Sequence, residues 1–304
     1  MLETINGQYI VLGVCCLIGT LALTTQWFVL VPSLGGWSSP QTLKSLGPLN
    51  LGILVLSYYY YLAIVTDPGK VPEGWEPPYS LIQRPEEVQS SKGETGPRFC
   101  RSCDAYKPPR AHHCRVCRRC VLKMDHHCPW INNCVGHGNY PHFIRFVFSV
   151  SLTCGYALYL LVWRLIQILD MNSQTDNLFF YYSILFKQNA LRPVKRTEMI
   201  FMVIDIVGVF ITVFSVSILS VYHGYCVIKG QSTIEAWERS KVKNLIKKKK
   251  IMPVDFPYDL GPFRNIASVL GNNILLWPFP LSSIGDGLTY TLLPNTGNHY
   301  FFFF

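Results

Sequence analysis

Cysteine and histidine are concentrated between Cys100 and Cys134, a segment with seven of the chain's eleven cysteines and four of its eight histidines. The pattern C-x2-C-x9-H-x6-C occurs twice there, and the second copy begins fourteen residues after the first, so the copies interleave. Each copy supplies three thiolates and one imidazole, a closed tetrahedral set that suits structural Zn²⁺ and leaves no position for catalysis. We therefore predict two structural zinc sites. The expected ligands are Cys100, Cys103, His113 and Cys120 in one site, and Cys114, Cys117, His127 and Cys134 in the other.

Cys128 falls where a third copy of the pattern would begin, but the three further ligands of that copy are absent. Asp125 and His126 precede it and also lie outside both ligand sets. In such a group the imidazole takes the thiol proton and the carboxylate fixes its tautomer, which is the arrangement of an activated nucleophile. The alternative is that all nine Cys and His positions share zinc in a different pairing.

The residues from Asp125 to Cys134 read Asp-His-His-Cys-Pro-Trp-Ile-Asn-Asn-Cys. They resemble the cysteine-rich domain of the DHHC family of membrane protein S-acyltransferases. The chain as a whole, with this segment and its short tail, looks most like the fungal endoplasmic-reticulum branch of that family. Family-like motifs also occur at 67–69 (Asp-Pro-Gly) and 232–235 (Ser-Thr-Ile-Glu), so the resemblance spans most of the chain. It implies that Cys128 takes an acyl group from acyl-CoA, with His126 as base and Asp125 orienting it, and passes the group to a substrate cysteine.

The resemblance also assigns supporting roles to Thr233, Glu235 and Asn265. The family motif is Thr-Thr-x-Glu, and its second threonine lies beside the catalytic aspartate. Here Ser232 replaces the first threonine, so only Thr233 and Glu235 carry over directly. Asn265 is similar to an asparagine of the family's C-terminal element. Ser232 with Glu235 is also a helix capping box, which is a sufficient structural explanation of that motif.

The chain is too apolar for an ordinary soluble domain, because 49% of its 304 residues are hydrophobic and only 15% are charged. Four uncharged runs are long enough to cross a hydrocarbon core of about 30 Å. These runs are 9–31, 46–65, 146–163 and 206–228. We predict an all-α integral membrane protein with four transmembrane helices and a cytosolic, zinc-bound, cysteine-rich domain between the second and third.

The orientation follows from the zinc sites and from the basic residues. Thiolate zinc sites need a reducing compartment, which places 66–142 in the cytosol. That loop carries eleven Lys and Arg residues, whereas the link between the first two spans carries only Lys44. Four basic residues in the far-side loop, 170–198, oppose this orientation, but the cluster within 239–250 is stronger. With four spans, both termini are expected in the cytosol, and the resemblance implies the endoplasmic reticulum membrane.

The chain divides into five parts by these criteria. They are 1–65, with the first two helices; 66–99, a Pro- and Gly-rich connector; 100–142, the zinc domain; 143–228, with the last two helices; and 229–304, a cytosolic tail. The zinc domain should form short hairpins with little hydrophobic core, because metal sites stabilise what so small a segment cannot bury. The short distance from the last ligand to the third helix places the thiol against the bilayer surface.

A thiol at this position suits a long-chain acyl-CoA, whose tail prefers hydrocarbon and whose head prefers water. Burying ~14 methylenes at about 0.8 kcal/mol each favours entry of the tail by on the order of 11 kcal/mol. Basic side chains beside the nucleophile are candidates to pair with the CoA phosphates, although a solvated cytosolic face explains them as well. They are Arg115, Arg118, Arg119 and Lys123.

The resemblance therefore implies a protein S-palmitoyltransferase. Its expected partners are membrane proteins with cysteines near the bilayer, acyl-CoA and the lipid itself, and nucleic acid is not among them. The alternative is a non-catalytic membrane adaptor whose zinc clusters only build a docking surface. Such an adaptor has no need of a lone thiol beside His126 and Asp125.

Overall fold

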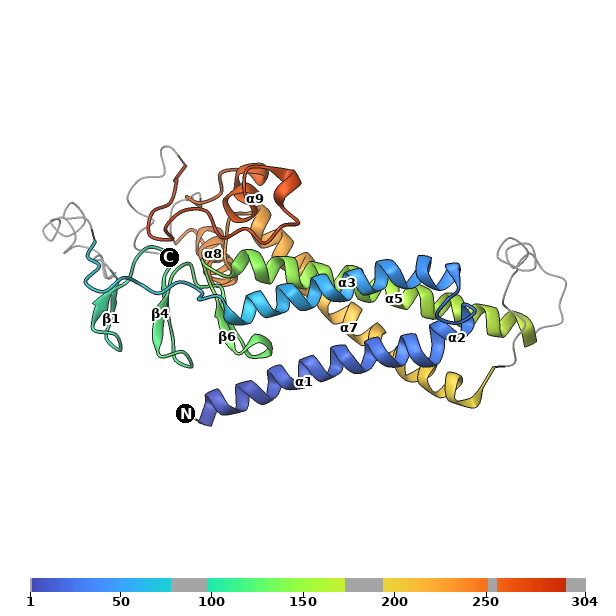
Figure 1. Ribbon diagram of the computed structural model, residues 1–304. Helices are drawn as coiled ribbons and strands as arrows, with labels where there is room; N and C mark the ends of the chain where they lie inside the picture. The colour runs from blue at the N-terminus through green and yellow to red at the C-terminus, as the bar shows by residue number, and fades with distance from the viewer. Residues whose placement is uncertain (1, 78–97, 173–193, 251–255, 294–304) are drawn as a thin grey trace, which may run out of the picture. The chain divides into compact units, whose positions relative to one another are not determined.

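The computed structural model describes residues 2–77, 98–172, 194–250 and 256–293 (Figure 1). Parts of the predicted architecture lie outside these described residues. They are the first residue, most of the connector (78–97), most of the loop between the third and fourth spans (173–193), and two stretches of the tail (251–255 and 294–304). The account below concerns the described residues.

The apolar runs form long helices, as predicted. Within the described ranges, four segments are long and apolar enough to cross a membrane: Gly7–Ser33, Pro40–Val65, Tyr140–Leu169 and Arg196–Ile228. The first span comprises most of α1 (Leu2–Thr24), the π-helical η1 (Thr25–Leu30) and α2 (Val31–Ser33). The other three spans lie in α3 (Pro40–Val65), α5 (Tyr140–Asn172) and α7 (Arg196–Ile228). The four-helix, multi-pass fold class is confirmed.

The third and fourth helices extend beyond the predicted spans, which ended next to Arg164 and Asp205, because both of these residues have polar partners in the fold. Arg164 and Glu198 are 0% and 1% exposed, and their Nη2 and Oε1 atoms lie 2.9 Å apart. Asp205 accepts a hydrogen bond of 2.7 Å from the Thr24 hydroxyl. Charged groups at membrane depth are found where such partners compensate them.

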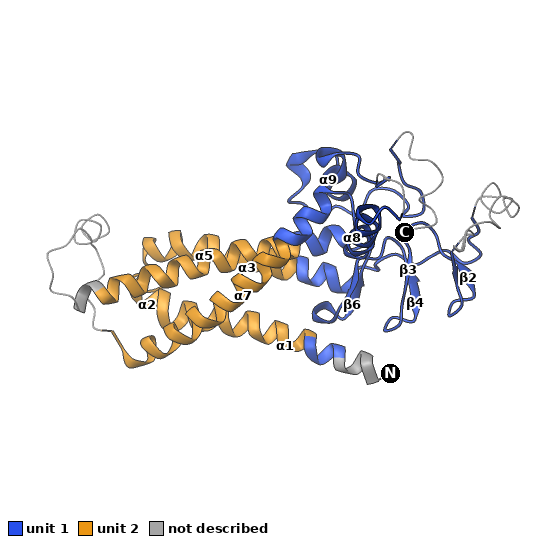
Figure 2. Ribbon diagram, turned by 180° about the vertical axis from the view of Figure 1, so that it is seen from behind, with its two compact units in different colours: residues 1–10, 59–145, 221–304 blue, residues 11–58, 146–220 orange. Residues whose placement is uncertain are grey.

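The described chain forms two compact units, coloured separately in Figure 2. One contains Val11–Tyr58 and Phe146–Ser220, and is built of transmembrane helix. Its core consists of aliphatic side chains from η1, α3, α5 and α7, among them Leu30, Leu161 and Met202. The other contains Met1–Ile10, Tyr59–Arg145 and Val221–Phe304, and holds every residue of the candidate site described below.

The zinc-domain segment forms three antiparallel hairpins in the part of the chain that the structure describes. They are β1 (Phe99–Cys100) with β2 (Ala105–Tyr106), β3 (His112–Cys114) with β4 (Arg119–Val121), and β5 (His126–Cys128) with β6 (Asn133–Val135). The last two share one register, in which His113 faces Cys120 and His127 faces Cys134. The 3₁₀ turn η2 (Pro129–Ile131) joins β5 to β6. The prediction of short hairpins is confirmed.

The C-terminal tail continues from α7 into α8 (Thr233–Lys247), α9 (Pro262–Leu270) and the 3₁₀ turn η3 (Ile274–Leu276). The predicted capping box begins α8. The Glu235 amide donates to Ser232 Oγ at 3.2 Å, and the Ser232 amide donates to Glu235 Oε2 at 2.7 Å. Two amides that the helix leaves unpaired are thereby satisfied, which fixes where α8 starts.

Candidate active site

The first predicted ligand set meets at the ends of the first two hairpins. His113 Nδ1 lies 3.5 Å from Cys100 Sγ, 3.2 Å from Cys103 Sγ and 4.0 Å from Cys120 Sγ. A nitrogen and a sulfur that share a tetrahedral zinc, with bonds of about 2.0–2.3 Å, lie about 3.5 Å apart. The four donor atoms therefore fit one Zn²⁺.

The second set meets one hairpin further along the chain. His127 Nδ1 lies 3.7, 3.4 and 3.6 Å from the Sγ atoms of Cys114, Cys117 and Cys134 respectively. These distances also match the edges of a zinc tetrahedron. The structure thus brings the eight predicted ligands together in the predicted pairing, and each set gathers within 4.8 Å.

His126 and Cys128 lie on β5 and Asp125 immediately precedes it, beside the second predicted ligand set but outside both sets. His126 Nδ1 hydrogen bonds Asp125 Oδ2 at 2.6 Å, and Cys128 follows two residues later on the same strand. Burial lowers the pKa of His126, but the Asp125 and Cys128 side chains outweigh it and raise the pKa to about 9. Burial likewise raises the pKa of Asp125, and the His126 bond overcomes it so that the net shift is downward. The arrangement pairs a basic imidazole with an ionised carboxylate and a thiol.

Thr233, at the start of α8, holds Asp125 from the other side. Its amide donates to Asp125 Oδ1 at 2.8 Å. Its hydroxyl lies 2.5 Å from the Asp125 carbonyl oxygen and 3.2 Å from Oδ2. These donors leave the carboxylate one orientation, toward His126. The tail therefore takes part in ordering the site, although it lies 108 residues further along the chain.

Glu235 anchors the same end of α8 to the hairpins through Arg110, which the sequence analysis did not single out. Arg110 Nε and Nη2 each donate to a Glu235 carboxylate oxygen at 2.6 Å, and both side chains are at most 5% exposed. The guanidinium also lies over the rings of Tyr258 and Tyr290. Since nothing in the spacing distinguishes Arg110 from the other basic residues of the loop, only the fold could reveal this pair.

Arg110→Met is expected to destabilise the fold by about 3–5 kcal/mol, because it leaves the Glu235 carboxylate buried without its partner. The measurement is thermal unfolding in detergent. Arg115→Met is the matched control, since Arg115 is exposed and should change the unfolding temperature little. Equal unfolding temperatures for the two variants would contradict a stabilising role for the pair.

Asn265 is 1% exposed and ties α9 to the end of α7. Its Nδ2 donates to the Ile228 carbonyl and to Asp259 Oδ1, both at 2.8 Å. Its Oδ1 accepts from the Leu260 amide at 2.9 Å. Both amide hydrogens and one oxygen lone pair are thereby used, and these bonds fix the path of the tail.

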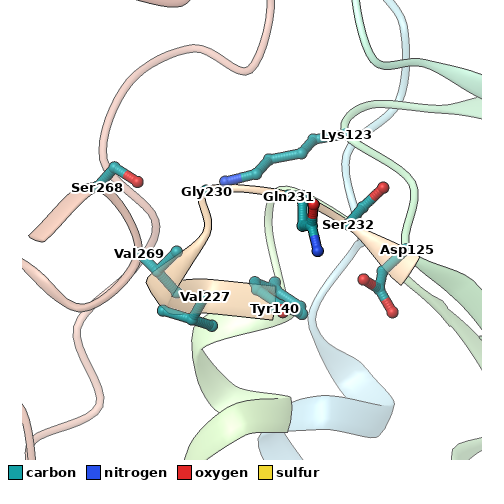
Figure 3. Close-up of a pocket in the computed structure, with 9 residues that line it drawn as sticks. All are labelled: Lys123, Asp125, Tyr140, Val227, Gly230, Gln231, Ser232, Ser268 and Val269. Carbon is teal, nitrogen blue, oxygen red and sulfur yellow. The ribbon is translucent and has the colours of Figure 1, made fainter. Parts of the chain in front are cut away.

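The basic residues predicted to bind CoA differ in their exposure and in their partners. Arg115 and Arg118 are exposed, while Arg119 Nη1 pairs with Asp67 Oδ2 at 2.7 Å. Lys123 enters a cavity of about 10 Å³, and Figure 3 shows its amine directed away from the Asp125 carboxylate. Burial and the Arg110 charge lower the pKa of Lys123 to about 7. The cavity is lined by Lys123, Asp125, Tyr140, Val227, Gly230, Gln231, Ser232, Ser268 and Val269.

His223 of α7 was not predicted, yet it lies beside the Asp125 carboxylate. Its Nδ1 is 4.0 Å from Asp125 Oδ2, and its ring centroid is 5.7 Å from that of His126. The position of His223 in the sequence could have identified it, because it lies within the predicted span 206–228. A histidine within a membrane span is rare, and by default it indicates a functional site.

Comparison with known proteins places this site in a family. The model of the DHHC palmitoyltransferase domain matches residues 93–240. Palmitoyltransferase ZDHHC15 of Xenopus laevis is 30% identical over 260 residues, which cover 79% of this chain and 69% of that protein. The chain belongs to the DHHC palmitoyltransferase family. The resemblance drawn from Asp125 to Cys134 is thereby confirmed.

Other DHHC relatives match along more of the chain. Palmitoyltransferase PFA4 of Mycosarcoma maydis is 38% identical over 296 residues, covering 90% of this chain and 58% of the relative. "Probable protein S-acyltransferase 16" of Arabidopsis thaliana is 33% identical over 283 residues, covering 92% of this chain and 89% of the relative. The chain therefore spans less than two thirds of the fungal PFA4 protein but most of the Arabidopsis one.

Proposed function

We propose that this DHHC protein is a protein S-palmitoyltransferase, which moves a long-chain acyl group from acyl-CoA to cysteine thiols of membrane-associated proteins. The observation that carries the proposal is the Cys128 thiol, which lies outside both ligand sets and two residues along β5 from an imidazole held by Asp125. Family membership supports the same reaction.

In the first step His126 accepts the Cys128 proton as the sulfur attacks the thioester carbon of acyl-CoA. A new bond forms between that carbon and Cys128 Sγ, and the bond to the CoA sulfur breaks. His126 then returns the proton to the departing CoA thiolate, so the products are acyl-Cys128 and free CoA. Asp125 stabilises the imidazolium in between, and its 2.6 Å bond to Nδ1 leaves the other ring nitrogen for proton transfer.

In the second step a substrate cysteine attacks the acyl-Cys128 thioester. His126 accepts the proton of the incoming thiol and then protonates the Cys128 sulfur as it leaves. The acyl group is now on the substrate, and the site returns to its starting state. Because the first and second steps use the same imidazole, Asp125 and Thr233 must hold it in one orientation throughout.

Two Zn²⁺ ions fit the two ligand sets and would supply folding free energy to this small segment. His127, between His126 and Cys128, would be fixed by one ion, and Cys134 would fix the facing strand. The ligands would thus keep β5 and β6 in register. Because Cys128 lies on β5, the metal site would also hold the nucleophile in place. The proposed catalytic domain is the segment 100–142.

We further propose that the CoA phosphates contact the basic residues near the nucleophile. Arg115 and Arg118 are the better placed of the four candidates, because both are exposed, whereas Arg119 and Lys123 are partly buried. The zinc domain, the tail from 229 to 304 and both termini are proposed to lie in the cytosol, where thiolate ligands stay reduced. The resemblance to the fungal branch supports the endoplasmic reticulum membrane, and substrate cysteines close to the bilayer.

Incubation of the purified protein with labelled palmitoyl-CoA should label the protein itself. Because a thioester is the expected intermediate, neutral hydroxylamine should release the label, and addition of an acceptor protein with a cysteine near the bilayer should transfer it. A non-catalytic adaptor would take up no hydroxylamine-sensitive label. Label that resists hydroxylamine would also count against the Cys128 thioester.

A further inference from the structure

His223 carries a buried polar atom that the proposed reaction does not use. The side chain is 1% exposed, and its Nδ1 makes no hydrogen bond within the described part of the chain. That nitrogen is 4.0 Å from Asp125 Oδ2, which is too long for a hydrogen bond. Burial of an imidazole nitrogen without a partner is unfavourable, so packing alone does not account for it.

Aromatic neighbours hold the His223 ring in place. The centroid of Phe143 lies 5.1 Å away and that of Tyr140 6.2 Å away, both edge-on. Tyr222, the preceding residue, lies 5.8 Å away. The ring therefore has little freedom to turn away from the site, and the nitrogen stays near the carboxylate.

Together with Asp125 and His126, His223 completes a possible ligand set. One ligand atom from each of the three residues lies within 4.8 Å of the other two. Two imidazoles and a carboxylate are a usual set for Zn²⁺ and other divalent first-row metals. These three residues supply three of the four ligands of a tetrahedral zinc, and water would take the fourth position.

We propose that the active site binds an additional Zn²⁺ through Asp125, His126 and His223, and that this ion inhibits acyl transfer. The inhibition rests on the proposed function. A metal bound to His126 occupies one nitrogen of that ring and takes part of the charge of Asp125. The imidazole is then no longer free to take the Cys128 proton.

The geometry predicts that this ion binds less tightly than the two structural ions. Nitrogen and oxygen ligands about 2.0–2.2 Å from a tetrahedral zinc lie about 3.4 Å apart. Asp125 Oδ2 lies 2.6 Å from His126 Nδ1 and 4.0 Å from His223 Nδ1. To bind the ion, the distance to His126 must lengthen and the distance to His223 must shorten. Thr233 already orients the carboxylate through its amide and hydroxyl, which is the support that ligands in metal sites usually have.

The test is a titration of the purified full-length protein with buffered free Zn²⁺, followed by both zinc stoichiometry and autoacylation. One zinc beyond the two structural equivalents should bind, dialyse away with a weak chelator, and inhibit in proportion to its occupancy. His223→Phe should keep the two structural ions and lose the additional one. Loss of a residue that only supports a metal ligand typically weakens metal binding by about 10–100-fold. Because His223 is proposed as a ligand itself, the zinc concentration for half inhibition should rise by at least that factor.

The matched control is His142→Phe. His142 is also a buried histidine with an unpartnered Nδ1 among the described residues, but it belongs to none of the ligand groups. This variant should bind the additional zinc as the unchanged protein does. If His223→Phe fails to fold, Asp125→Asn serves in its place, read by stoichiometry alone.

Two results would overturn the proposal: a stoichiometry that stays at two while zinc rises, or equal inhibition of His223→Phe and the unchanged protein. Absence of any autoacylation at low free zinc is a separate result. It would overturn the proposed function, and stoichiometry would still decide whether the additional ion binds.

Discussion

Cys128→Ser is expected to abolish formation of the acyl-enzyme and to leave both structural zinc ions in place. The loss should be on the order of 10⁶-fold, the scale observed when the nucleophile of a catalytic triad is removed. Zinc is expected to remain because Cys128 belongs to neither of the two Cys-His ligand sets. The measurements are hydroxylamine-sensitive label from palmitoyl-CoA and zinc content of the same preparation.

Cys15→Ser is the control for this experiment, because Cys15 is an exposed cysteine of α1, remote in sequence from the hairpins. It should retain full autoacylation and full zinc content. Loss of an equivalent of zinc from Cys128→Ser would instead show that Cys128 is a metal ligand. The alternative pairing, in which all nine Cys and His positions share zinc, would then be preferred.

Neighbouring histidines should give opposite results when each is replaced by alanine. His126→Ala should slow acyl-enzyme formation by about 10²–10⁴-fold, the usual contribution of a positioned base, with both zinc ions retained. His127→Ala should release the second zinc and destabilise the hairpin, because a structural zinc site contributes folding free energy directly. The basis is that His127 Nδ1 faces three Sγ atoms, whereas His126 Nδ1 faces Asp125.

Zinc stoichiometry, autoacylation rate and thermal unfolding of both variants give the answer together. A His126→Ala protein short of one zinc, or a His127→Ala protein with both, would reverse the two roles. A Cys117→Ser variant provides a second test of the same cluster, since it removes a thiolate and should match His127→Ala in metal loss.

The local parts of the structure were predictable from the sequence because their signals are local. The zinc ligands recur at fixed spacing, and each histidine lies across a hairpin from its cysteine, as in the pair of His127 and Cys134. The capping box of Ser232 and Glu235 spans four residues. The apolar runs determine the helices directly, although their ends required knowledge of how Arg164 and Glu198 pair.

The remaining features depend on contacts between distant segments, which spacing cannot reveal. Arg110 meets Glu235 across 125 residues, and His223 reaches Asp125 only because the end of α7 returns to β5. Lys123 is near the nucleophile in sequence, but its spacing could not show where its side chain points. In the fold it lines a small cavity together with Asp125 and residues of the tail, and its amine is directed away from the Asp125 carboxylate.

The distance along the sequence between the hairpins and the tail has a consequence for biosynthesis. All eight zinc ligands emerge from the ribosome within one short segment, so the metal clusters can assemble while the rest of the chain is still being made. Thr233, which orients Asp125, is translated 108 residues later, after the fourth membrane helix. A nascent chain would thus acquire its metal-bound scaffold early and an aligned Asp125 carboxylate only once α8 is being made. The proposed active site would therefore stay incomplete until all four of these membrane helices have been synthesised.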